Sequence, residues 1–180
     1  MNMLLAQVEH WLDNVVIGLN LCPFARKPRQ DNQIRFKLSE AGTSEQLLND
    51  LYDELSLLEN TPPQEIETTL IIVSNMLADF DGYNQFLDSV DDLLASFGWT
   101  GTFQVASFHP DYCFSDTHPD DIENLTNRAP APVLHLIREQ SMERALKHIT
   151  APDEIFKRNI DTMHRLTDEQ IKTLFPYLYP

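Results

Sequence analysis

Positively charged residues are missing from the middle of this sequence. No Lys or Arg occurs between Lys37 and Arg128, and the 180 residues carry 13 Lys and Arg against 28 Asp and Glu, a net charge of −15. An acidic protein repels nucleic-acid phosphates and anionic lipid surfaces, so we expect neither nucleic acid nor a membrane as a partner. The cations before and after the gap predict a local basic pocket for a small anion. The alternative is that the charges only form a solvated acidic surface.

Cysteine is scarce as well, and long apolar runs are absent. Two cysteines build neither a disulfide framework nor a four-ligand zinc-finger site. No run of about 18 apolar residues indicates a transmembrane helix. The N-terminal residues show neither the basic region nor the small-residue cleavage site of a signal peptide. We therefore expect a reduced, cytoplasmic protein with no cofactor.

The hydrophobic residues, 42% of the chain, alternate between helical and strand-like periods. Strand patterns cover residues 33–38, 68–74 and 102–108, and helical patterns cover residues 3–17, 43–58 and 81–97. The order strand, helix, strand, helix, strand predicts a small, mainly parallel three-stranded sheet with right-handed crossovers. We predict one α/β domain over residues 1–180, with an N-terminal helix and C-terminal helices.

The part after the third expected strand begins with a polar, acidic stretch without periodicity, residues 109–127. Such a long loop is typical of a functional or mobile segment. Its His and Asp side chains are either metal ligands or simply solvated. No pair of them has the i, i+4 spacing of a helical zinc site, so we predict no metal. Two prolines then precede an expected helix from about Val133, Pro152 fits the first turn of another, and Thr167 begins a capping box for the last.

The first candidate site is the stretch around Cys22. Pro23 fits the first position of a short helix, which makes Cys22 its N-cap. Backbone N–H groups there, together with Arg26, lower the pKa of a thiol and favour a nucleophilic thiolate. The alternative is a cysteine that only packs in the core. Asn20 is either a turn residue or a polar lining of the same site.

The second candidate is His109, which directly follows the third expected strand, as Asn75 follows the second. Ligands and catalytic groups of open parallel sheets lie beyond the carboxyl ends of the strands. His109 is therefore a candidate general base, and Asp111 a candidate to orient it. Alternatively, His109 only hydrogen-bonds a turn.

The third candidate lies around Arg128, which ends the block without cations. A guanidinium beside a helix N-terminus is a good fork for a carboxylate or phosphate, and Asn127 adjoins it. His135 and Arg138 are three residues apart and would share a face of the expected helix. Alternatively, Arg128 forms a surface ion pair and His135 is a half-buried structural histidine. The predicted substrate-binding residues are Asn20, Arg26, Asn75, Asn127, Arg128, His135 and Arg138.

Four longer strings run through these candidates: NLCPFARKP, NMLADFDGYNQFL, GTFQVASFHPDY and TNRAPAPVLHLIRE. Together they resemble the family called domain of unknown function 1415, over residues 5–165. The family pattern has an aromatic residue between the two prolines where this chain has Ala131, so no stacking role is expected there. The resemblance implies a bacterial-type cytosolic protein and no particular activity. The site candidates inside the matched strings are Cys22, His109, Asp111, Asn127, Arg128 and His135.

Our first functional hypothesis is an enzyme acting on a small anionic metabolite. Cys22 would be its nucleophile or acid, His109 its base, Asp111 the orienting group, and Arg26 with Arg128 the anion clamp. The alternative is a non-catalytic module that binds a small anion or an acidic segment of a partner. A third hypothesis is an assembly protein whose aromatic surface joins subunits. The sequence does not predict an oligomeric state.

Overall fold

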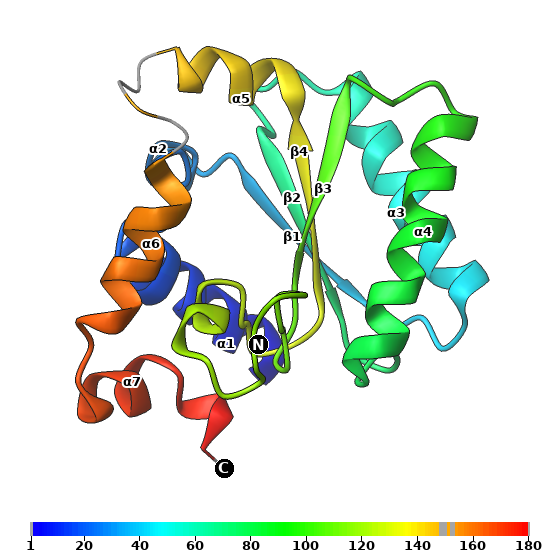
Figure 1. Cartoon of the computed structure of the whole chain (residues 1–180). Helices are drawn as coiled ribbons and strands as arrows, with labels where there is room; N and C mark the ends of the chain where they lie inside the picture. The colour runs from blue at the N-terminus through cyan, green and yellow to red at the C-terminus, as the bar shows by residue number, and fades with distance from the viewer. Residues whose placement is uncertain (1, 148–150, 152–153, 180) are drawn as a thin grey trace.

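The centre of the protein is a mixed β-sheet, seen edge-on in the computed structural model (Figure 1), which describes residues 2–147, 151 and 154–179. Within these residues the sheet has four strands in the order β1-β2-β4-β3. Strand β1 (Ile34–Ser39) is parallel to β2 (Thr68–Val73), and β4 (Val133–Arg138) is antiparallel to both β2 and β3 (Phe103–Phe108). The α/β class is confirmed. The three-stranded, mainly parallel sheet was wrong.

The error lies in β4, which we predicted as a helix from Val133. Pro130 and Pro132 hold the residues before them in extended conformations, and the apolar run that follows is only six residues long. In the sheet it lies between β2 and β3, where its backbone groups pair on both sides. His135 and Arg138 therefore do not share a helix face, because side chains three apart in a strand point to opposite sides.

One face of the sheet is covered by α3 (Ser44–Asn60) and α4 (Phe80–Ser96), as Figure 1 shows. Thr43, the first residue of the predicted helical pattern over residues 43–58, caps α3 by accepting a hydrogen bond from the N–H of Gln46. Helix α4 begins slightly earlier than predicted and is capped by Asp79. The buried side chains on this face include Leu47, Leu51, Leu55, Leu58, Tyr83, Phe86, Val90 and Leu94. Strand β2 is buried along its whole length, which confirms its prediction as a central strand.

The other face carries the N-terminal and C-terminal helices (Figure 1). Their bounds are α1 (Met3–Trp11), α2 (Arg26–Gln30), α5 (Glu139–Leu146), α6 (Ile155–His164) and α7 (Asp168–Leu174), with short 3-10 turns η2 (Ile122–Thr126) and η4 (Pro176–Leu178). The predicted capping box at Thr167 is confirmed. Pro152 lies outside the described residues. No helix in the described part of the chain combines the length and apolar character that a membrane span requires.

The predicted helix over residues 3–17 has two parts. Its second half, η1 (Leu12–Ile17), is wound as a π-helix, with one more residue per hydrogen-bonded turn than α1. Gly18 is its C-cap, and a Cβ at this position would lie 2.2 Å from the carbonyl oxygen of Asn14. Glycine is therefore required here by a close backbone approach. The chain then turns toward Cys22.

Candidate functional site

A cavity of about 610 Å³ opens between the sheet and the helices on the α1 side. Its floor is one face of the sheet, since side chains at alternate positions of a strand point the same way. The register places Leu70 of β2 and Ala106 of β3 on either side of His135 of β4. The floor residues are Thr68, Leu70, Ala106, Phe108, His135 and Ile137.

The walls come from segments far apart in the sequence. Trp11 and Val16 of the N-terminal helix lie on one side, and α5 lies on the other with Met142 and Ala145. The Trp11 ring packs edge-on against the Phe108 ring, with the ring centroids 5.2 Å apart. A mostly apolar cavity with a few convergent polar groups is the usual form of a small-molecule site. The polar and charged residues that line it are Cys22, Lys27, Gln33, Glu67, Thr68, His135, Arg138, Ser141 and Arg144.

The Cys22 side chain lies in the turn before α2 and lines this cavity. Helix α2 begins only at Arg26 with Ala25 as its N-cap, so the prediction of Cys22 as the N-cap was wrong. The backbone N–H groups of Phe24 and Ala25 do lower the pKa of the thiol, but burial is the larger effect and raises it above its ordinary value. Burial therefore favours the protonated thiol over the predicted thiolate.

The imidazole of His135 is the second polar group of the floor. Its Nε2 lies 2.7 Å from the Thr68 hydroxyl oxygen, and that hydroxyl also contacts the carbonyl oxygen of Leu136. The Phe108 ring lies beside it at a centroid distance of 6.4 Å. Burial lowers the pKa of His135 to about 4. The imidazole is thus neutral at physiological pH, with one nitrogen that carries a proton and one that does not.

The structure does not bring His109 to this cavity. Its side chain is buried against Phe80 and Tyr83 of α4, at ring-centroid distances of 5.3 and 5.1 Å. Nδ1 accepts a hydrogen bond from the backbone N–H of Asp111 at 3.0 Å, and Nε2 lies 3.0 Å from the carbonyl oxygen of Leu77. Both nitrogens are engaged, and Asp111 orients the ring through its backbone rather than its carboxylate. This geometry corresponds to the alternative of a histidine that holds a turn.

Arg128 is also used within its own part of the fold. It precedes a strand rather than a helix, so the helix N-terminus that we predicted beside it was wrong. Its Nε donates to the carbonyl oxygen of Tyr112 at 3.3 Å, and its Nη2 donates to that of Pro119 at 2.6 Å. Its own carbonyl oxygen accepts from the Tyr177 hydroxyl at 3.0 Å. The guanidinium therefore ties together the loop over residues 109–127.

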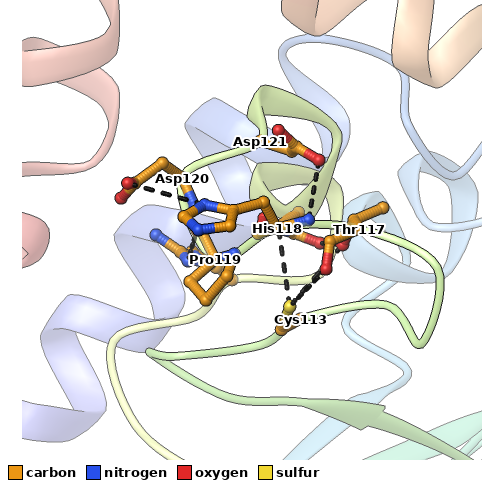
Figure 2. Close-up of polar contacts among 8 residues, drawn as sticks. Cys113, Thr117, His118, Pro119, Asp120 and Asp121 are labelled. Atoms are coloured by element: carbon orange, nitrogen blue, oxygen red, sulfur yellow. Dashed lines mark hydrogen bonds and ion pairs between the residues drawn. The ribbon is translucent and has the colours of Figure 1, made fainter.

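This loop is organised by the buried side chain of Asn124. Its Oδ1 accepts from the Thr117 hydroxyl at 2.8 Å, and its Nδ2 donates to the carbonyl oxygen of His118 at 2.8 Å. Figure 2 shows the surrounding contacts, including the Cys113 thiol against Thr117 and the Asp121 carboxylate on the N–H of His118. Among the described residues no group of three or more His, Cys, Asp or Glu side chains is placed to hold a metal. No local sequence pattern predicted that Asn124 organises this loop.

The other predicted binding residues make backbone contacts. Asn20 adopts a left-handed conformation with φ of 54°, which corresponds to the turn alternative. Arg26 donates to the carbonyl oxygen of Ile17 at 3.1 Å, Asn75 to that of Glu40 at 3.0 Å, and Asn127 to that of Ser107 at 3.2 Å. Arg138 lines the cavity, but its Nη2 donates to the carbonyl oxygens of Thr61 and Ile66 at 2.7 and 3.0 Å.

Of the predicted site residues, Cys22, His135 and Arg138 therefore line the cavity. Sequence reasoning missed Thr68, Trp11 and Arg144. Thr68 is the first residue of a strand, and its neighbour His135 becomes visible only once the β2–β4 pairing is known. Trp11 lies within the apolar helical pattern of residues 3–17, and such a pattern does not distinguish a core residue from one that lines a cavity.

The comparisons with known proteins give a family and no further relative. The family described as Protein of unknown function (DUF1415) matches residues 3–173. The chain belongs to this family, which confirms the resemblance carried by the four strings. Searches among curated proteins and among solved structures found no match.

Proposed function

We propose that this member of the DUF1415 family binds a small anionic metabolite with a large apolar part in the Cys22–His135 cavity. The observation that carries the proposal is the cavity itself, about 610 Å³ in volume and lined mainly by aromatic and aliphatic side chains. Burying the apolar part of a ligand there is favourable by about 25 cal/mol for each Å² removed from water. We also propose a cytosolic, reducing location, which would keep Cys22 a thiol.

Two exposed cations support the negative charge that we propose for the ligand, although Glu67 also lines the cavity. Lys27 and Arg144 contribute exposed side chains to its lining. Lys27 is paired with Asp31 at 2.6 Å, and Arg144 donates to the Ser141 hydroxyl at 3.0 Å. An ammonium retains further donors in such a pair, and a guanidinium has five N–H donors in all. In a protein with a net charge of −15, these two side chains favour a carboxylate at the cavity mouth.

Fluorescence of Trp11 is the direct test, in a Trp99→Phe background that leaves Trp11 as the reporter. Octanoate should quench or shift the emission saturably, and heptylammonium, which has the same heptyl tail and the opposite charge, should bind at least about tenfold more weakly. Ala106→Phe fills the cavity from its floor and should weaken octanoate binding by about tenfold or more. Ala95→Phe, on the exposed side of α4, is the matched control.

Equal binding of octanoate to the Ala106→Phe and Ala95→Phe variants would move the site elsewhere. Equal binding of the two probes would remove the anionic group from the proposal. The Arg144→Gln variant tests one of the two cations. It should weaken the binding of octanoate and leave the binding of octanol, an uncharged probe, unchanged.

The placement of Cys22 and His135 in one cavity supports a second candidate function, an enzyme that moves protons. A neutral imidazole is a base and a thiol is an acid, and one of each is needed to remove a proton from a bound substrate and return it elsewhere. Proton NMR of candidate carboxylates in D₂O tests this function. Loss of a C–H signal that requires both Cys22 and His135 supports it, and loss that persists in the Cys22→Ser or His135→Leu variants contradicts it.

A further inference from the structure

The hydroxyl of Thr68 determines where the proton of His135 lies. A threonine hydroxyl has one proton to donate, and it faces two groups, the carbonyl oxygen of Leu136 and Nε2 of His135. A carbonyl oxygen is only an acceptor, so the short contact with Leu136 requires the Thr68 proton between the two oxygens. In the contact of 2.7 Å between the hydroxyl oxygen and Nε2, Nε2 must then carry the proton and donate it to the hydroxyl oxygen.

The assignment leaves the other ring nitrogen with a free lone pair. Because the imidazole is neutral and carries its proton on Nε2, Nδ1 is an acceptor. Nδ1 has no hydrogen-bond partner within the part of the chain that the structure describes, yet it is not one of the buried side-chain atoms there that lack partners. It therefore keeps access to open space.

That space is the cavity. Strand β4 is an interior strand, and its neighbours Leu134 and Leu136 are buried on the α3–α4 side. His135 points the other way and lines the floor of the cavity. The half-buried His135 side chain therefore faces the cavity. An acceptor surrounded by aliphatic and aromatic groups costs free energy when a ligand displaces water from it without replacing the hydrogen bond.

We infer that Nδ1 of His135 is a specificity-determining acceptor, and that the ligand carries a neutral hydrogen-bond donor, a hydroxyl group, at the end away from its carboxylate. This inference rests on the proposed function, because it concerns the opposite end of the same ligand. A carboxylate on the floor would place its lone pairs against that of Nδ1, so the charged end lies at the mouth with Lys27 and Arg144. The Phe108 ring beside His135, with the Trp11 ring packed edge-on against it, suits an aryl body.

Three probes that share the 3-phenylpropionate frame and differ only at the para position test the inference: 3-(4-hydroxyphenyl)propionate, 3-phenylpropionate and 3-(4-methoxyphenyl)propionate. Isothermal titration calorimetry should show the hydroxyl probe binding about three- to tenfold more tightly than the phenyl probe, the range for one hydrogen bond. The methoxy probe, which has an acceptor and no donor, should show no gain. In the His135→Leu variant the hydroxyl and phenyl probes should bind equally.

A second variant and a direct measurement keep the test independent of the folding of His135→Leu. Thr68→Val removes the partner that holds the proton on Nε2, so the advantage of the hydroxyl probe should shrink while the phenyl probe still binds. The ¹⁵N shifts of His135, assigned with a His135 variant, should show a protonated Nε2 and an unprotonated Nδ1 at pH 7. The reverse tautomer overturns the inference.

The outcomes separate the inference from the proposed function. If the hydroxyl and phenyl probes bind equally to the wild-type protein, the cavity takes an apolar anion and His135 does not select it, so the inference alone fails. If none of the three probes binds, the proposed function fails as well. If the methoxy probe gains as much as the hydroxyl probe, a donor is not what the floor recognises, and the inference is again wrong.

Discussion

The half-buried imidazole of His135 should make the stability of the protein fall on mild acidification. In the folded protein its pKa is about 4, against 6.5 for an ordinary histidine. Above pH 6.5 both the folded and unfolded states are neutral at this site, and the contribution to stability is fully present. As the pH falls from 6.5 to 4, His135 is protonated in the unfolded chain but stays neutral in the folded protein, so the free energy of unfolding decreases across that range.

The magnitude follows from the difference between the two pKa values. At 1.36 kcal/mol per pH unit, the full loss is about 3 kcal/mol below pH 4, and about 2 kcal/mol of it is reached at pH 5. Urea unfolding at pH 8 and pH 5 measures the effect. The His135→Gln variant has no imidazole at this site, so its free energy of unfolding should fall by about 2 kcal/mol less between the two pH values than that of the wild type.

Other groups titrate in the same range, and the comparison is built to cancel them. Burial also lowers the pKa of His109, which adds to the loss in both proteins equally. His118→Gln is the matched control, because the His118 side chain is 71% exposed. It should behave as the wild type. If His135→Gln loses as much stability as the wild type between pH 8 and pH 5, the imidazole is not held neutral by burial. The assignment of Nδ1 as a free acceptor would then be wrong as well.

Three further predictions concern the backbone, the ion pairs and the thiol. Gly18→Ala should lower the free energy of unfolding by about 1–3 kcal/mol, because its Cβ would lie 2.2 Å from a carbonyl oxygen. Gly42→Ala should be nearly neutral in the same urea titration, because the nearest atom to a Cβ there, Oε1 of Gln46, lies 3.9 Å away. Arg35→Met should lower the free energy of unfolding by about 2 kcal/mol at pH 7, because it leaves the Glu54 carboxylate, which is 4% exposed, without its ion-pair partner. Adding Glu54→Gln should recover most of that loss. Cys22 should react with iodoacetamide slowly at pH 7 and faster above about pH 8.5, since burial raises its pKa, and a fast rate that is flat with pH would contradict this reading of the thiol.

The elements with a strong local period were predictable from the sequence. The stripe of Leu47, Leu51, Leu55 and Leu58 identifies α3, since residues three and four apart share one helix face, and Thr43 marks where it starts. Strand β2 was recognisable as a buried central strand from its β-branched run. In these segments the local preference and the tertiary environment favour the same structure.

Strand β4 could not be predicted from its local sequence. A short apolar run such as Val133–Arg138 fits a buried strand or a buried helix equally well by its periodicity. The choice depends on β2 and β3, each of which would otherwise leave backbone N–H and C=O groups unpaired along one edge. Those partners lie far away in the sequence, so the register that brings His135 to Thr68 could not be foreseen.

The candidate site divides in the same way. The sequence by itself determined that Cys22 and His135 are chemically capable residues in distinctive motifs, and that the cations flank an acidic middle. Only the tertiary structure decided that these two side chains line one cavity while His109 and Arg128 hold a separate loop. It also decided the protonation states. The N–H groups next to Cys22 lower the thiol pKa locally, but burial, which depends on everything packed around the residue, is the larger effect and raises it.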